Sequence, residues 1–256
     1  MRPERESPHS CLVLHGLGGG PYEVAPIIEA LKADGLKVSA PILPGHEGPG
    51  PVMPSSTWRD WIAAAIQAFD ELAVDGAPVA VVGFSTGGTL ALELSTLRPV
   101  ASQVLLAPFL AIRFSRVIPV APAVYLRAIA RVMPNLWRRP PAVRDRAVRG
   151  QLARASEFRT FSLGATLSAL ELIERVKPML PKIVTPTLIL QGRLDTVVEP
   201  RDAQWLLEHL GSSRKDLVIL SRSDHLLAHD RDRVEVIRRT LNFLCGSDPI
   251  AGGLSH

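Results

Sequence analysis

Residues 79–88 read VAVVGFSTGG, and this stretch decides the fold. Its first four residues are small or β-branched and apolar, which is typical of a strand buried on both faces. The leucine-rich segment that follows predicts a helix over residues 86–97. Between strand and helix lies the spacing Gly83-x-Ser85-x-Gly87, so the chain must turn sharply within a few residues. Glycines at 83 and 87 allow neighbouring backbone to pass close to that turn.

The turn is expected to hold Ser85 in a strained backbone conformation and to lift its hydroxyl to the carboxyl edge of a sheet. The backbone N–H of Thr86 then points toward a reacting carbonyl, and the helix N-terminus favours negative charge there. Ser85 is therefore the candidate nucleophile, and Thr86 is one candidate donor to an oxyanion. The alternative is a glycine-rich turn with an idle serine, which the flanking strand and helix disfavour.

Short apolar runs alternate with helical patterns along most of the chain, and hydrophobic residues make up 46% of it, enough for a large core. The alternation predicts an α/β fold: a mostly parallel sheet of about six strands with helices on both faces. Ser56 or Thr57 is an expected helix N-cap, and Gly35 and Gly211 stand where a helix C-cap requires positive φ. Strands are expected over residues 11–15, 37–40, 79–83, 103–107, 187–191 and 217–220, and helices over residues 22–34, 57–74, 86–97, 200–210 and 232–244.

The alternation stops between residues 109 and 181. Prolines and helical stretches fill this segment without a recognisable strand, so we expect a helical insertion at one edge of the sheet. The predicted division is a core of residues 1–108 and 182–246, a helical cap of residues 109–181, and a flexible tail of residues 247–256.

The net charge is +4, and the positive charge is concentrated in the predicted cap. Two interpretations remain for this segment: a solvated basic face, or a surface that makes weak contact with anionic membranes or acidic substrates. Nucleic acid is not an expected partner, because neither zinc-ligand spacing nor an aromatic–basic RNA-binding motif occurs. The cap has arginines at 113, 116, 127, 131, 138, 139, 144, 146, 149, 154 and 159, against Asp145 and Glu157.

The two cysteines, Cys11 and Cys245, indicate neither a disulfide framework nor a metal site. No apolar run approaches the roughly 18 residues of a membrane-spanning helix. The charged N-terminus is not followed by the apolar core of a signal peptide. We therefore expect a cytoplasmic protein without a metal; the oligomeric state is left open.

A second glycine-rich loop, HGLGGG at residues 15–20, follows the first predicted strand. Its glycines allow a backbone N–H to approach a substrate oxygen, and Leu17 is the candidate donor that pairs with Thr86. A nucleotide site is disfavoured because the loop lacks the G-x-G-x-x-G order and the Walker lysine. The residues expected to support these two loops are His15, Gly16, Gly83 and Gly87.

An activated serine needs an imidazole within hydrogen-bond reach, and the imidazole needs an acid that fixes its tautomer. Asp195 lies four residues after the strand expected at 187–191, and His225 lies five residues after the strand expected at 217–220. Both loops should meet Ser85 at the carboxyl edge of the sheet. Asp195 is therefore the candidate acid and His225 the candidate base. The alternatives are His229 as base, and, with poorer positions, His46, His209, Glu199, Asp202 and Asp224.

The segments HGLGGGP, PILPGHEGP, TWRDW, GFSTGG, LILQGRLDTVVEP and SRSDH together resemble bacterial carboxylesterases and monoacylglycerol lipases of the α/β-hydrolase superfamily. The resemblance covers about residues 11–244, apart from the insertion. It implies the α/β-hydrolase fold, a helical cap over an acyl pocket, and no cofactor. The chain departs from the family pattern at Glu47, where the family loop usually has glycine, and in the arginine and proline content of its cap.

Together, the resemblance and the candidate triad predict hydrolysis of short- to medium-chain acyl esters or monoacylglycerols through an acyl-enzyme on Ser85. Thioesterase, amidase, perhydrolase or acyltransferase activity with the same triad remains open, as does a non-catalytic ligand-binding protein. Epoxide or haloalkane cleavage is disfavoured, because position 85 is not an aspartate. One group of apolar cap residues either lines an acyl channel or packs the cap's own helices: Val117, Ile118, Val120, Val124, Leu126 and Ile129.

Overall fold

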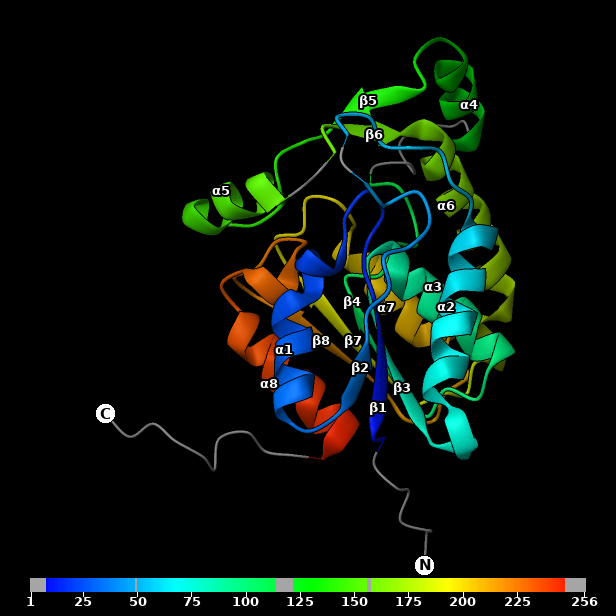
Figure 1. Cartoon of the computed structure of the whole chain (residues 1–256), viewed down its shortest axis with the longest axis vertical. Coiled ribbons are helices and arrows are strands. Elements are labelled where there is room, and N and C mark those ends of the chain that lie inside the picture. Colours follow the sequence, from blue (N-terminus) through cyan, green and yellow to red (C-terminus); the bar gives the residue numbers. More distant parts are fainter. Residues whose placement is uncertain (1–7, 49, 114–121, 156–157, 247–256) are drawn as a thin grey trace, which may run out of the picture.

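The computed structural model describes residues 8–48, 50–113, 122–155 and 158–246. Its centre is a six-stranded sheet in the order β2-β1-β3-β4-β7-β8, in which every neighbouring pair is parallel (Figure 1). The predicted α/β class with about six strands is therefore confirmed. The strands are β1 Ser10–Leu14, β2 Lys37–Ser39, β3 Val79–Phe84, β4 Ser102–Leu106, β7 Thr187–Gly192 and β8 Lys215–Leu220.

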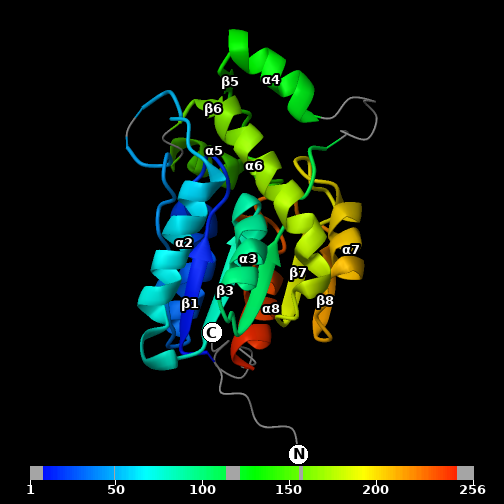
Figure 2. The same cartoon turned by 90° about the vertical axis from the view of Figure 1, so that its right-hand side faces the viewer.

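Helices cover both faces of this sheet because successive strand side chains point to opposite sides. In β1, Cys11 and Val13 pack with α1 and α8, whereas Leu12 and Leu14 pack with α2, α3, α6 and α7. Figure 2 shows the second group of helices in front of the sheet. The bounds are α1 Ala25–Ala33, α2 Trp58–Leu72, α3 Thr86–Leu97, α6 Leu163–Val176, α7 Pro200–His209 and α8 Arg233–Cys245.

The predicted helix ends are correct in two places and wrong in one. Thr57 caps α2: its backbone N–H donates to Asp60 Oδ2 at 3.0 Å, and its Oγ1 accepts from the Asp60 N–H at 3.4 Å. Gly35 follows α1 with a φ of 91°. Gly211 does not have positive φ, because α7 already ends at His209. A Cβ at Gly211 would clash with the carbonyl oxygen of Pro181, so close backbone approach explains this glycine.

The insertion after β4 contains helices α4 Pro122–Val132, α5 Arg146–Ala155 and α6, and it ends in the short helix η4 Lys177–Lys182. It also contains an antiparallel pair, β5 Asn135–Trp137 with β6 Thr160–Ser162, so the expectation of a segment without strands is wrong. Strands of three residues are too short to produce a detectable alternation. α6 packs on the core helices, and the Trp58 N–H at the start of α2 donates to Ser168 Oγ at 2.7 Å.

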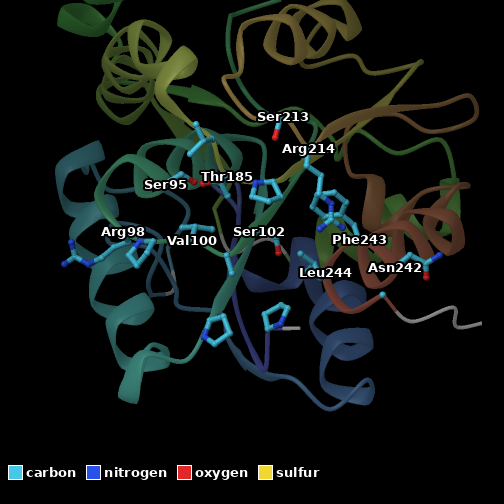
Figure 3. Close-up of a pocket in the computed structure, with 17 residues that line it drawn as sticks. Ser95, Arg98, Val100, Ser102, Thr185, Ser213, Arg214, Asn242, Phe243 and Leu244 are labelled. Atoms are coloured by element: carbon cyan, nitrogen blue, oxygen red, sulfur yellow. The ribbon is translucent and has the colours of Figure 1, made fainter. Parts of the chain in front are cut away.

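An open groove of about 900 Å³ lies at the amino ends of the strands. Ser102 at the start of β4, Thr185 before β7 and Phe243 of α8 line it (Figure 3). This edge is opposite to the one at which Ser85 follows β3. None of the helices in the described part of the chain combines the length and the apolar character needed to cross a membrane.

The contact between Gly211 and Pro181 leads to a test of stability. Gly211→Ala should lower the free energy of unfolding by about 1–3 kcal/mol, because the added methyl group forces the backbone apart. Gly150→Ala in α5 is the matched control: the new methyl group meets nothing within 4 Å, and alanine favours the helix by about 0.5–1 kcal/mol. Chemical denaturation of both variants measures these changes, and equal stabilities would contradict the close approach.

Candidate active site

The sharp turn after β3 holds Ser85 at the N-cap of α3, with a φ of 53° and a ψ of −117°. Positive φ is costly for a serine and persists only where the surroundings enforce it. A Cβ at Gly83 would clash with the carbonyl of Gly87, and a Cβ at Gly87 would clash with the carbonyl of Leu14. Glycine at both positions therefore makes the turn possible, as the spacing predicted.

Three loops at the carboxyl edge of the sheet bring Ser85, His225 and Asp195 together. His225 Nε2 lies 3.0 Å from Ser85 Oγ, and His225 Nδ1 lies 2.8 Å from Asp195 Oδ2. All three residues are buried, with Ser85 8% exposed. The serine comes from the β3–α3 turn, the aspartate from the loop after β7, and the histidine from the loop after β8. An Nδ1–H that donates to the carboxylate leaves Nε2 free to accept the serine proton.

The carboxylate of Asp195 is held by backbone as well as by the imidazole. Its Oδ1 accepts from the N–H groups of Val197 and Val198, each at 2.8 Å, and its Oδ2 also accepts from Gln191 Nε2 at 2.9 Å. Burial raises the pKa of Asp195, but the charge and hydrogen bond of His225, with the two backbone hydrogen bonds, outweigh burial, so the pKa is lowered. The carboxylate is therefore ionised and fixed in direction.

The alternative acids and bases are engaged elsewhere. His229 Nε2 lies 2.8 Å from the carbonyl oxygen of Tyr22 and donates to it. Asp224 Oδ1 accepts from the Thr196 N–H at 2.8 Å, which orders the loop that carries Asp195. The other candidates hold helix or loop positions: His46 in the loop after β2, Glu199 at the N-cap of α7, and Asp202 and His209 within α7.

His15 and His46 hold the HGLGGG loop against the loop after β2. His15 Nε2 accepts from the Leu43 N–H at 3.0 Å, and His46 Nε2 accepts from the Gly18 N–H at 2.9 Å. Burial and the neighbouring His46 lower the pKa of His15 to about 3, so His15 stays neutral and can accept. The expected structural role of His15 agrees with these contacts.

Two backbone N–H groups, those of Leu17 and Thr86, are the predicted oxyanion donors. Thr86 is the first residue of α3, where backbone N–H groups lack partners within the helix. The N–H groups on either side of Leu17 are both engaged, that of Gly16 with Glu23 at 3.1 Å and that of Gly18 with His46. This arrangement orients the Leu17 peptide, and the role of both donors stays a prediction.

Glu23 is a residue of the site that the sequence analysis missed. It lies in the short helix η1 Pro21–Val24, is 5% exposed, and accepts from the Gly16 N–H. Burial raises its pKa to about 7, against the opposing charges of Arg138 and His225 and the Gly16 hydrogen bond. The available signal was an acidic residue shortly after the glycine-rich loop, at the start of the helix expected over residues 22–34.

Three arginines of the predicted cap contact the loops of the site and do not only face solvent. Arg113 donates to the carbonyl of Asp195, and Arg138 donates to the carbonyl of Gly18. Arg144 Nη2 donates to the carbonyl of Leu194 at 3.3 Å, next to Asp195. The cap is therefore tied to the acid loop and to the glycine-rich loop by charged hydrogen bonds.

The predicted acyl channel has little support from the described cap residues. Val124 and Ile129 of α4 are exposed, at 57% and 40%, and Leu126 is half-buried. Val117, Ile118 and Val120 lie outside the described residues. A cavity of about 140 Å³ lies beside the glycine-rich loop, where Gly18 and Tyr22 face Phe158 of the cap. Within the described ranges, no group of three or more His, Cys, Asp or Glu is placed to hold a metal ion.

Comparison with known proteins identifies the family of this chain. The family model Hydrolase_4, described as serine aminopeptidase S33, matches residues 5–232. The thermostable monoacylglycerol lipase of Bacillus sp. strain H-257 is 27% identical over 238 residues, which cover 92% of this chain and 90% of that protein. A carboxylesterase of Bacillus subtilis strain 168 is 22% identical over 234 residues, 91% of each chain.

Solved structures share the fold. The monoacylglycerol lipase of Paleococcus ferrophilus superposes with a TM-score of 0.80 at 21% identity, covering 93% of this chain and 95% of that one. A structure from the metagenome-derived lipolytic enzymes LipS and LipT gives a TM-score of 0.81 at 24% identity, over 94% and 95% of the two chains. The chain thus belongs to the Hydrolase_4 family of α/β-hydrolases and is a hydrolase of the lipase and esterase class.

Proposed function

We propose that this protein hydrolyses carboxylic esters, with short- to medium-chain acyl esters or monoacylglycerols as substrates, through an acyl-enzyme on Ser85. The observation that carries the proposal is the continuous hydrogen-bond chain from Ser85 Oγ through His225 to Asp195. The substrate class is supported by the similarity to a bacterial monoacylglycerol lipase and a carboxylesterase.

The proposed reaction has two halves. His225 Nε2 takes the proton from Ser85 Oγ as this oxygen attacks the ester carbonyl, and the N–H groups of Leu17 and Thr86 stabilise the oxyanion, each by roughly 3 kcal/mol. The imidazolium then gives its proton to the leaving alkoxide, which departs as the alcohol. Water enters, loses a proton to His225 and attacks the acyl group, and Ser85 leaves with that proton.

The substrate assay is a series of nitrophenyl esters of graded acyl length. Ser85→Ala should lower kcat by about 10⁶-fold, because the residues of such a triad act as a unit. Ser213→Ala, which changes an exposed serine distant from the site, should leave kcat unchanged. Labelling by a fluorophosphonate should occur in the wild type and in Ser213→Ala, and not in Ser85→Ala.

Other outcomes of that assay separate the alternatives. Turnover of thioesters or amides with slow ester turnover would favour those substrates, and dependence on an acceptor alcohol would favour acyl transfer. A wild-type protein that neither turns over any ester nor reacts with fluorophosphonate contradicts catalysis by Ser85 and favours a ligand-binding protein.

The pH dependence follows from the surroundings of His225. Burial lowers the pKa of His225, but the charge and hydrogen bond of Asp195, with the charges of Glu23 and Asp224, outweigh burial and raise it above its ordinary 6.5. Since the base acts when neutral, kcat/KM should rise with pH with a midpoint above 6.5 and reach its plateau above that midpoint.

Asp195→Asn removes the main counter-charge, so the midpoint should move downward and kcat should fall by about 10⁴-fold. Asp216→Asn, an exposed change on β8, should move neither quantity. A wild-type midpoint below 6.5, or one that Asp195→Asn leaves in place, would contradict the assigned pair.

We further propose that the cap makes weak contact with anionic membranes. Val132 and Trp137 are 88% and 81% exposed, beside the exposed cations Arg131 and Arg139. Exposed aromatic and aliphatic groups among arginines are typical of a surface that lies in the headgroup region.

Vesicle sedimentation tests this contact. Binding to vesicles rich in phosphatidylglycerol should weaken with added salt and with Val132→Ser/Trp137→Ser, while Val234→Ser, an exposed change on α8, should have no effect. Absence of binding, or binding that salt does not weaken, would contradict a contact of this kind.

A further inference from the structure

We propose that Glu23 is a positioning residue for the oxyanion loop, defined as His15 to Gly20, and that Arg138 of the cap holds the Glu23 carboxylate in its working position. The inference rests on the proposed ester hydrolysis and concerns the loop that would bind the oxyanion. If the inference holds, the buried ion pair of Glu23 and Arg138 controls both the docking of the cap and the shape of the oxyanion loop.

The oxyanion loop is folded around the carboxylate of Glu23. The Gly16 N–H donates to Oε2 at 3.1 Å, and a Cβ at Gly16 would come within 3.2 Å of the same oxygen. A Cβ at Gly19 would overlap the carboxylate outright. Gly19 does not have positive φ, so the space taken by Glu23, and not the backbone conformation, accounts for this glycine.

Arg138 completes this arrangement from the cap. Its Nη2 lies 3.6 Å from Glu23 Oε1, and its Nη1 donates to the carbonyl of Gly18. The same guanidinium reaches the hydroxyl of Tyr22 at 3.4 Å. Both side chains are shielded, at 20% exposure for Arg138 and 6% for Glu23.

The pair therefore holds the oxyanion loop on both sides of Leu17. Glu23 fixes the N–H of the preceding residue, Gly16, and Arg138 fixes the carbonyl of the following residue, Gly18. A donor to an oxyanion is effective only when its direction is set before the reaction, because reorganisation during the reaction costs free energy. The Gly16 carbonyl, which shares a peptide plane with the Leu17 N–H, lies 2.9 Å from His15 Nδ1. Fixing the peptide groups on either side as well restricts the direction of the Leu17 N–H.

Stability alone does not explain a carboxylate at this position. Desolvation of a buried ion pair commonly cancels its Coulomb attraction, and apolar residues of the same size often stabilise a protein as well or better. Burial raises the pKa of Glu23 to about 7, with the charges of Arg138 and His225 acting in the opposite direction. A costly ionisable group that contacts a catalytic loop is typical of a functional role.

The two oxygens of Glu23 meet two different demands, and this makes Glu23→Gln informative. Oε2 accepts from the Gly16 N–H, while Oε1 faces Arg138. Glutamine has one oxygen, which accepts, and one NH₂ group, which donates. In Glu23→Gln the NH₂ group must therefore face a second donor, either the Gly16 N–H or the Arg138 guanidinium. Removing the guanidinium as well, in Glu23→Gln/Arg138→Met, allows the remaining oxygen to turn toward Gly16.

The experiment measures kcat and KM for nitrophenyl butyrate and the inhibition constant of a trifluoromethyl ketone. The ketone forms a tetrahedral adduct whose oxyanion occupies the loop, so its affinity reports transition-state binding. Glu23→Gln and Arg138→Met should each lower kcat about 10–100-fold, somewhat less than deletion of a donor, and should weaken the ketone in parallel with little change in KM. The double variant should lose no more than the worse single variant.

Matched controls are Glu29→Gln on α1 and Arg154→Met on α5, which change exposed residues of the same charge and should leave all three quantities unchanged. Thermal unfolding of each variant reports folding. A Glu23→Gln protein that fails to fold leaves Arg138→Met to decide the proposal by the same readouts, because Arg138 reaches the loop from the cap.

The results distinguish this inference from the proposed function. A wild-type protein without ester turnover contradicts the function itself. A wild-type protein that turns over, with variants that keep kcat and ketone affinity while losing thermal stability, shows a purely structural ion pair and overturns the inference. Losses that simply multiply in the double variant also overturn it, because independent effects would mean that the two side chains do not act on one loop conformation.

Discussion

The whole site depends on one buried imidazole that bonds to two partners at once. His225 Nε2 lies 3.0 Å from Ser85 Oγ and His225 Nδ1 lies 2.8 Å from Asp195 Oδ2, although these partners are far apart along the chain. The parallel sheet brings the loops that follow β3, β7 and β8 to one edge, where the three side chains meet. Other features of the site place these side chains. Gly83 and Gly87 permit the strained turn that carries Ser85, and backbone hydrogen bonds fix the carboxylate of Asp195.

Much of this was predictable because it follows from local rules with strong steric causes. The elbow at Ser85 and the strand ends before Asp195 and His225 leave clear patterns in the sequence. Other features left no such pattern. Gly211 is glycine because Pro181 lies against it, which is a tertiary contact, and β5 and β6 are too short to alternate.

The burial of Glu23 and the partial burial of several cap arginines were likewise not predictable from the sequence. A glutamate or arginine in a polar, proline-rich stretch reads as solvated, since local sequence does not reveal which charges become buried. Arg113, Arg138 and Arg144 instead reach from the cap to the loops of the site. The basic character of the cap therefore has two parts: arginines that dock the cap on the core, and exposed ones around Trp137.

The central claim is that Ser85 becomes acylated during turnover, and trapping that intermediate tests it most directly. Protein quenched in acid during steady-state turnover of a nitrophenyl ester is digested and analysed by mass spectrometry. The account predicts the mass of one acyl group on the peptide that contains Ser85. An acyl group on a different residue, or sustained turnover with unmodified Ser85 under conditions where deacylation limits the rate, would contradict the account.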